Sequence, residues 1–410
     1  MVFSGESIFE ANGAILSQNT GQRMKRPPVI FLSTCEFSGD MHGAVLLQEL
    51  QKILPEAVYY GIGGPRMKAA GMGQIYDPTR QSTIGFTEIF KNLGQAKQVF
   101  NRILAEWEKR RPDIMIWLDS GGFNLPLAKA AKERGIPVVC MFSPSAWAYN
   151  QGRAVKLAQR VELLLAVLPF EAGFYQKFGA KAEYVGHPLI DKVKNSLEPA
   201  GYRRQLNVGA NQRLVALLPG SRRQEITNLL PVMLKAAEIV DQGHEIKWVL
   251  PLAQSLSRDF LEAILAKTSV KIEVIGQTDV YNLLAAADAA VISSGTATLE
   301  AAILNTPMII IYRVSKLSYL IYKMMQNPSQ RNKPDMVGLP NWILGKIIVP
   351  EFTQNNLTSP NIATALEELL EPARNQELRQ CLSQVKTMIG PPGVMPRAAI
   401  RIVELLNSSL

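Results

Sequence analysis

Residues 289–300 read AAVISSGTATLE, and this stretch decides the fold. The uncharged run Ala289–Ser293 predicts a buried β-strand, and Gly295 predicts a tight turn into a helix. A strand that turns directly into a helix is the repeating unit of α/β proteins with parallel sheets. The stretch therefore predicts one unit of a doubly wound α/β domain.

The same alternation runs along the chain from Pro28 onward. Unbroken apolar runs separated by amphipathic segments are typical of parallel strands that helices cover on both faces. Helices are predicted between the strands, the first over Met41–Ile53, and in the tail at Ile362–Leu370, Gln376–Met388 and Arg397–Leu406. The predicted strands are Val29–Ser33, Val58–Ile62, Asp113–Leu118, Val138–Phe142, Leu163–Leu168, Leu214–Leu218, Ile246–Leu250, Val270–Ile275, Ala289–Ser293 and Met308–Tyr312.

The pattern is interrupted near mid-chain by Asn195, Pro199 and Gly201, which predict a linker. We therefore expect a mobile N-terminal extension over residues 1–27, a first Rossmann-like domain over 28–195 and a second over 205–385. Two doubly wound domains joined in this way predict a ligand cleft between them.

Composition limits the class of protein. The 410 residues are 47% apolar and 19% charged, which suits a globular chain of two domains. The net charge of +9 favours anionic partners, such as phosphorylated ligands, an acidic membrane surface or nucleic acid. The basic residues form no cluster interleaved with aromatic residues, so we expect no nucleic-acid partner.

Cysteine, histidine and hydropathy patterns exclude further classes. Three cysteines and three scattered histidines argue against a disulfide framework and against a metal site, so neither a metal nor a cofactor is expected. No apolar run reaches the ~18–20 residues of a membrane-spanning helix, and the first 27 residues lack the apolar core of a secretory signal. These features favour a cytoplasmic protein.

Two strand–turn–helix loops in the second half are typical of anion sites. In LLPGSRR, residues 217–223, Gly220 and Ser221 leave backbone N–H groups at a helix start, and Arg222 or Arg223 adds a forked cation for a diphosphate. An ordinary turn capped by Ser221 explains the same residues.

The second loop repeats this arrangement with Gly295, Thr296, Ala297 and Thr298. Glu300 follows about one helical turn later, where a carboxylate can accept both hydroxyls of a ribose. A solvated first-turn residue that complements the helix dipole is the alternative for Glu300. The chain has no GxxxxGK[ST] loop, and Gly61–Pro65 lacks the third glycine of a dinucleotide fingerprint, which disfavours phosphoryl transfer and a dehydrogenase.

Candidate residues for the chemistry lie in the first half. Asp119 directly follows an apolar run, at the strand end where ligands of α/β sheets bind, and can act as a general base on a hydroxyl. A turn aspartate before two glycines is the alternative. Glu36 has no evident capping role, whereas Ser38 and Asp40 can either bind a ligand or cap the helix that follows.

Further polar and aromatic residues follow later strands. Ser143, Ser145 and Trp147 can shape a sugar or acyl pocket, although a buried anchor explains Trp147 equally well. His187 falls at the predicted domain junction, as a ligand contact or as a hydrogen-bonded hinge residue. The apolar and basic segment Ile84–Lys91 suits contact with a membrane-associated acceptor, with a core helix face as the alternative.

Taken together, the motifs resemble the lipid-A-disaccharide synthases, a glycosyltransferase family with the GT-B fold. The resemblance runs from Val29 to Leu406, and its motifs share order and spacing with the family. They are SGDMHG (38–43), GIGGPRM (61–67), SPSAWA (143–148), LPFE (168–171), YVGHPL (184–189), LLPGSR (217–222), SGTATLEA (294–301) and LPN (339–341).

The resemblance implies transfer of 2,3-diacylglucosamine from its UDP derivative to 2,3-diacylglucosamine 1-phosphate, without a metal. It implies an acceptor-binding first domain, a UDP-sugar-binding second domain, and a peripheral protein on the inner face of the cytoplasmic membrane. It also implies a homodimer, in which the C-terminal helix of residues 386–410 either packs back on the first domain or is exchanged. By position, Asp119 matches the catalytic aspartate, and the residues matched to UDP are Arg222, Gly295–Thr298, Glu300 and Asn341.

The sequence departs from the family beside Asp119. The family usually has DAPDFN, whereas residues 119–124 read DSGGFN, and Cys35 stands where a glycine is usual. Two alternatives therefore stay open. One is a GT-B glycosyltransferase with a different acceptor, and the other is a non-catalytic nucleotide-sugar-binding protein.

Overall fold

This computed structural model describes residues 26–79, 93–119, 121–149, 151–314 and 336–409. Most of the predicted N-terminal extension and the segment Ile84–Lys91 lie outside these ranges. No helix among the described residues is long and apolar enough to cross a membrane.

The first sheet has seven strands in the order β3-β2-β1-β4-β5-β6-β7. Strand β1 pairs in parallel with β2 and with β4, in a register that places Ile30 opposite Ile114. All residues of β1 and β4 are buried, as expected for apolar strands that helices cover on both sides. The strands are β1 (Val29–Ser33), β2 (Val58–Ile62), β3 (Gly73–Tyr76), β4 (Ile114–Trp117), β5 (Val138–Met141), β6 (Leu163–Ala166) and β7 (Ala182–Tyr184).

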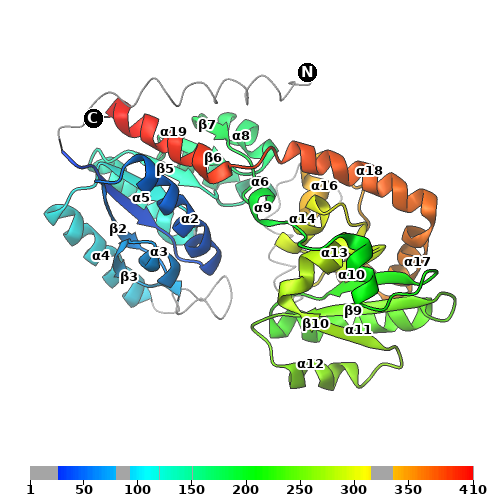
Figure 1. Cartoon of the computed structure of the whole chain (residues 1–410). Helices are drawn as coiled ribbons and strands as arrows, with labels where there is room; N and C mark the ends of the chain where they lie inside the picture. The colour runs from blue at the N-terminus through cyan, green and yellow to red at the C-terminus, as the bar shows by residue number, and fades with distance from the viewer. Residues whose placement is uncertain (1–25, 80–92, 120, 150, 315–335, 410) are drawn as a thin grey trace. The chain divides into compact units, whose positions relative to one another are not determined.

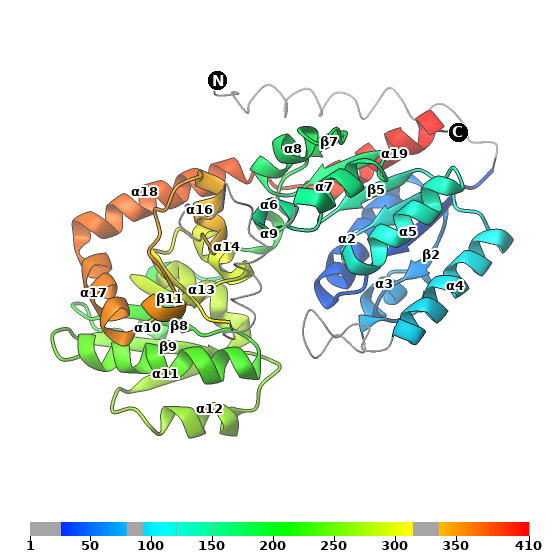
Figure 2. The same ribbon diagram turned by 180° about the vertical axis from the view of Figure 1, so that it is seen from behind.

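Helices cover both faces of this sheet. Helices α2 (Phe37–Ile53) and α3 (Pro65–Ala69) lie on the near side in Figure 1, whereas α4 (Leu93–Lys109) and α5 (Gly121–Glu133) lie on the near side in Figure 2. Shorter helices connect the later strands and lead to the second sheet. They are α6 (Ala146–Tyr149), α7 (Gln151–Ala158), α8 (Pro169–Gln176), α9 (Leu189–Lys192) and α10 (Pro199–Gln205).

The second sheet has six strands in the order β10-β9-β8-β11-β12-β13, and its pairs are parallel. Helices α13 (Val280–Ala286) and α14 (Thr296–Ile303) cover one face, and α11 (Arg223–Val240) and α12 (Arg258–Leu265) lie on the other (Figures 1 and 2). The strands are β8 (Arg213–Leu218), β9 (Ile246–Leu252), β10 (Ile272–Gly276), β11 (Ala289–Ser293), β12 (Met308–Tyr312) and β13 (Glu351–Thr353).

The C-terminal part is helical, with α16 (Leu339–Leu344), α17 (Ser359–Leu370), α18 (Pro372–Met388) and α19 (Val394–Ser409). The chain divides into two compact units. The first unit consists of three segments, which are the described residues up to Met141, the short segment Arg160–Glu162, and the described residues from Ala399 onward. The second unit consists of the described residues in Phe142–Gln159 and Leu163–Ala398. The predicted functional domains, 28–195 and 205–385, stay a prediction.

The fold class is confirmed, and β1, β2, β11 and β12 have the predicted bounds. Strands β3, β7 and β13 escaped prediction because they have three or four residues and are mostly half-exposed, so no apolar run marks them. Helix α2 begins at Phe37, four residues before the predicted start.

Candidate active site

Asp119 lies just beyond the carboxyl end of β4 and holds the turn between β1 and α2. Its Oδ1 accepts a hydrogen bond of 2.7 Å from the Cys35 N–H. Its Oδ2 accepts from the Thr34 hydroxyl and, at 3.1 Å, from the Glu36 N–H. A carboxylate has about four lone-pair sites, so about one remains for a ligand.

Burial raises the pKa of Asp119 from its usual 3.8 to about 7, and the nearby charge of Glu36 also raises it. The hydrogen bonds from Thr34, Cys35 and Glu36 lower the pKa and offset only part of the burial. A general base works best when its pKa lies near the working pH. The two residues predicted for catalysis, Asp119 and Glu36, therefore lie together, and Asp119 has the electrostatics of a base.

Neighbours missed in the sequence fix Asp119 in place. The buried amide of Asn124 donates to the Asp119 carbonyl and accepts from the Ser33 hydroxyl. A Cβ at Gly39 would lie 1.8 Å from Asp119 Oδ2 and 2.0 Å from Thr34 Oγ1. Helix α2 can therefore approach Asp119 only because residue 39 has no side chain.

Ser38 and Asp40 do not cap α2, because both lie inside its first turn. Ser38 is exposed. Asp40 is fully buried, and its carboxylate accepts the N–H groups of Gly64, Arg66 and Met67 at 2.8–3.1 Å, which caps α3. Asp40 therefore has a structural role in holding the start of α3, and its carboxylate is not directed at a ligand.

In the first predicted diphosphate loop, Gly220–Arg222, the backbone N–H groups already bind the carboxylate of Glu225. Glu225 Oε2 accepts the N–H groups of Ser221 and Arg222 at 3.1 and 3.3 Å, and Oε1 forms a 3.0 Å ion pair with Arg222. Gly220 has a φ of 115°, and a Cβ there would lie 2.4 Å from Glu225 Oε2. The sequence suggested a cap by Ser221, but Glu225 is the capping side chain of α11.

The second loop holds no such internal anion among the described residues. Among the described residues, none accepts a hydrogen bond from the N–H groups of Thr296 and Ala297 at the start of α14. Gly295 is exposed, and a Cβ there would meet no atom within 4 Å. The Thr298 hydroxyl instead donates back to the Gly295 carbonyl at 2.8 Å, which holds the turn. Two N–H groups at a helix start with open space before them can bind an anion.

Glu300 lies on α14, half-buried, one turn beyond this opening. The Tyr281 hydroxyl donates to its Oε1 at 3.0 Å, and no group of the described residues donates to its Oε2. Burial raises the pKa of Glu300, whereas the Tyr281 hydrogen bond and the charge of Lys192 lower it. Tyr281 carried no sequence signal, because it reaches Glu300 from a different helix.

Asn341 has no polar group left for a ligand. Its Nδ2 donates to Val349 O and Glu351 Oε1, and its Oδ1 accepts the N–H groups of Ile348 and Val349. Two donors and two acceptor sites are all that an amide side chain offers, and Asn341 is fully buried. A direct contact of the Asn341 side chain with UDP was expected, and its geometry instead gives it the role of holding the turn before β13.

Ser143 and Trp147 converge on Glu171. The Trp147 indole N–H donates to Glu171 Oε1 at 3.1 Å, and the Ser143 hydroxyl donates to the same atom at 3.4 Å. Trp147 also packs edge-on against Phe170 and Trp342, with ring centroids 4.9 and 4.8 Å away. These contacts favour the alternative that Trp147 is a packing anchor, although its side chain is half-exposed. Ser145 is also half-exposed.

His187 lies in a loop that is hydrogen-bonded to the connection between α18 and α19. The His187 backbone N–H donates to the Ile389 carbonyl, and the imidazole Nδ1 accepts the Leu189 N–H at 3.2 Å. Arg397 donates to the Val185 carbonyl, and Asp191 accepts the N–H groups of Gly393 and Val394. These bonds favour a hinge role for His187 over ligand contact.

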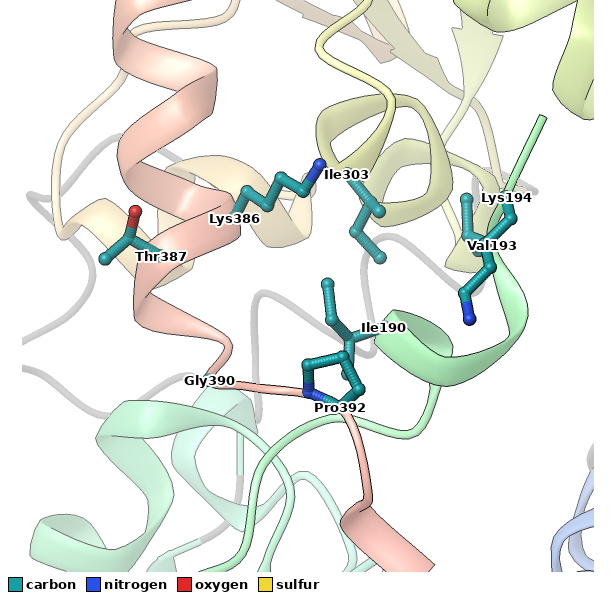
Figure 3. Close-up of a pocket in the computed structure, with 8 residues that line it drawn as sticks. All are labelled: Ile190, Val193, Lys194, Ile303, Lys386, Thr387, Gly390 and Pro392. Atoms are coloured by element: carbon teal, nitrogen blue, oxygen red, sulfur yellow. The ribbon is translucent and has the colours of Figure 1, made fainter. Parts of the chain in front are cut away.

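A cavity of about 420 Å³ lies away from the open loop, beside Ile303 near the far end of α14 (Figure 3). Ile190, Val193 and Ile303 give it an apolar lining, and Lys194 and Lys386 also line it. No residue predicted for the site lines it. In the part of the chain that the structure describes, no group of three His, Cys, Asp or Glu residues could hold a metal.

Solved structures share this architecture. The chain superposes on the crystal structure of the glycosyltransferase of kitacinnamycin with a TM-score of 0.60 and 16% identity, over 93% of this chain and 100% of that one. Two doubly wound parallel sheets in one chain are the architecture of the GT-B fold.

The sequence comparison is more specific. The model of the lipid-A-disaccharide synthetase family matches residues 30–389. The lipid-A-disaccharide synthase of Syntrophus aciditrophicus is 37% identical, over 93% of this chain and 98% of that protein. The one of Geobacter sulfurreducens is 33% identical, over 96% and 100%. This chain belongs to the lipid-A-disaccharide synthetase family, whose members are glycosyltransferases with a nucleotide-sugar donor and a sugar acceptor.

Proposed function

We propose that this protein transfers 2,3-diacylglucosamine from its UDP derivative to the 6-hydroxyl of 2,3-diacylglucosamine 1-phosphate. The products are the β-1,6-linked disaccharide 1-phosphate and UDP. The observation that carries the proposal is the open start of α14, where two N–H groups have no acceptor among the described residues and Glu300 lies one turn behind them. Membership of the lipid-A-disaccharide synthetase family supports acylated sugars as donor and acceptor.

On the donor side, the diphosphate binds at Gly295–Ala297. This loop is preferred over Gly220–Arg222 because the N–H groups of Ser221 and Arg222 already donate to Glu225. The N–H groups and the dipole of α14 stabilise the negative charge that develops on the diphosphate as its bond to the sugar breaks. Glu300 accepts hydroxyls of the ribose through Oε2, which has no hydrogen-bond donor among the described residues.

On the acceptor side, Asp119 takes the proton of the attacking hydroxyl as that oxygen bonds to the anomeric carbon of the donor. Its pKa of about 7 lets it be ionised before the reaction and bind the proton during it. The Asn124, Ser33 and Thr34 contacts orient Asp119 without touching the substrate.

We also propose that the protein works as a peripheral protein at the inner face of the cytoplasmic membrane, because both sugar substrates carry acyl chains that partition into lipid. A homodimer with exchanged C-terminal segments stays a prediction. Sedimentation of the purified protein with and without anionic vesicles tests both points.

Purified protein mixed with the UDP-linked donor and the acylated acceptor 1-phosphate should give the disaccharide and UDP in equal amounts, with no loss of rate in EDTA. Mass spectrometry of the lipid product and chromatography of UDP measure the two products. UDP binding without any disaccharide would reject this acceptor and favour the alternative of a different one.

Glu300→Gln should reduce the preference of the protein for UDP over 2′-deoxy-UDP by about tenfold, because a hydrogen bond to a charged group contributes about 1.5–3 kcal/mol. Tyr281→Phe should change the preference in the same direction and less, because it removes only the group that orients Glu300. Calorimetric titration with both nucleotides measures the ratio. Equal weakening for the two nucleotides would remove Glu300 from the ribose site.

A further inference from the structure

The most exposed large apolar side chain among the described residues belongs to Phe37, which is 57% exposed. Phe37 is the first residue of α2 and directly follows Glu36. An exposed aromatic ring lacks the stabilisation that burial would give it, so its position calls for a functional or structural reason. The contact of the ring with Arg66 gives such a reason.

Arg66 lies over this ring, with its guanidinium carbon 4.9 Å from the ring centroid. That distance is within the ~6 Å range of cation–π attraction, and a planar guanidinium stacks well on an aromatic face. The Arg66 backbone is also fixed, since its N–H donates to the buried Asp40 of α2 at 3.1 Å. Phe37 and Arg66 are therefore held by two helices that one buried carboxylate ties together.

Arg66 is an exposed residue. In the described ranges no carboxylate forms an ion pair with Arg66. An arginine that is oriented by a ring but has no such ion pair presents a forked set of donors to a ligand, and this fork matches the oxygens of a phosphate.

The position of the pair relates it to the chemistry. Phe37 follows Glu36, whose N–H donates to Asp119, so residue 37 directly follows the turn that Asp119 holds. In a glucosamine 1-phosphate the phosphate and the 6-hydroxyl are attached on either side of the ring oxygen. A base for the hydroxyl and a cation for the phosphate must therefore lie within one sugar ring of each other.

We propose that Arg66, oriented by Phe37, binds the phosphate monoester of the acceptor. The proposal rests on the proposed function and adds the group that distinguishes a phosphorylated from an unphosphorylated acceptor sugar. The phosphate carries a charge near −1.5 to −2 at pH 7, and the fork of Arg66 pairs with it through charge-assisted hydrogen bonds.

The test compares Arg66→Gln with the wild-type full-length protein on two acceptors, the acylated sugar 1-phosphate and the same sugar without phosphate. KM for the phosphorylated acceptor should rise about tenfold or more in the variant. KM for the unphosphorylated acceptor and for the UDP-sugar should stay the same. Phe37→Leu should raise the KM for the phosphorylated acceptor less than Arg66→Gln does. Arg66→Lys should also raise this KM less than Arg66→Gln, because lysine keeps the charge but not the fork of donors.

Arg110→Gln is the matched control, because the Arg110 guanidinium carbon also lies over a ring, 5.7 Å from the centroid of Tyr60. Arg110 precedes the amino end of β4, whereas Asp119 follows the carboxyl end of that strand. It should leave both acceptor KM values unchanged. Inorganic phosphate at roughly 10 mM, a concentration that suits a single exposed arginine, should compete with the phosphorylated acceptor in the wild-type protein. Arg66→Gln should lack this competition.

Equal KM changes for the two acceptors in Arg66→Gln, or an unchanged preference, would overturn the inference. These outcomes are separate from failure of the proposed function, in which the wild-type protein forms no disaccharide with either acceptor. Thermal melting of each variant ensures that the comparison is made on folded protein.

Discussion

Asp119→Asn should lower kcat at least about 100-fold, because a positioned general base contributes roughly 10²–10⁴ to the rate. Asparagine keeps the shape of the side chain, and its oxygen can still accept the Cys35 N–H that Asp119 now accepts. Its amide nitrogen would face the Glu36 N–H, so the variant should lose that hydrogen bond and some stability. It should still bind UDP like the wild type, because the proposed UDP contacts lie on α14. Steady-state kinetics with both substrates, alongside calorimetric binding of UDP, measure the two effects.

The pH profile tests the role of Asp119 separately. With a pKa of about 7, ionised Asp119 becomes abundant only as the pH rises through that value, so kcat should increase from pH 6 to 8. Glu36→Gln should shift this rise to lower pH, because the charge of Glu36 raises the pKa of Asp119. A profile that loses its rise in Glu36→Gln and keeps it in Asp119→Asn would instead make Glu36 the base.

The contribution of Asp119 to stability should change in the opposite direction. Its folded pKa is raised above the unfolded value of about 3.9, so the folded state binds the extra proton between these values. This contribution is fully present below pH 4 and is lost as the pH rises through 7. Asp119→Asn should remove this part of the pH dependence of unfolding, which denaturant titrations at pH 5 and 8 can measure.

Gly39→Ala should destabilise the protein by about 1–3 kcal/mol or more and abolish most activity, because overpacking displaces the surrounding groups. The added Cβ would lie 1.8 Å from Asp119 Oδ2 and 2.0 Å from Thr34 Oγ1, so either α2 or the carboxylate has to move. Both atoms belong to the cluster that orients the base. Urea titration and kcat measure the two losses.

Gly122→Ala is the control, since it makes the same substitution near the start of the neighbouring helix α5. No atom lies within 4 Å of a Cβ at Gly122, so its stability should be unchanged or slightly raised by the helix preference of alanine. Equal destabilisation by the two substitutions would show that close approach at Gly39 is not what makes it necessary. Gly122 also replaces the second aspartate that is usual in the family, and the open space shows room for a side chain there.

The order of strands and helices could be read from the chain because apolar periodicity is local. Strands β1, β2, β11 and β12 follow their uncharged runs to the residue, since each is buried along its whole length or nearly so. The loop at Gly295–Thr298 and Glu300 were predictable for the same reason, since the strand, the turn and the helix start are consecutive in sequence.

Partners far apart in sequence could not be predicted. Asp40 and Asn341 are polar residues beside glycine or proline, a pattern shared by ligand contacts and structural caps. Only the tertiary structure shows that Asp40 binds the start of α3, 24–27 residues away, and that Asn341 uses all its polar atoms internally. Whether a side chain is available to a ligand depends on which groups folding brings to it.

The sequence by itself determined the α/β class, the strand order along the chain, the family and the position of Asp119 at a strand end. The tertiary structure decided which of two similar loops is open, because Glu225 fills one of them and no described group fills the other. It also decided the electrostatics of Asp119, because its raised pKa comes from burial beneath a turn 85 residues away in the chain. Local patterns fix local structure, whereas burial and hydrogen-bond partners arise only when distant segments meet.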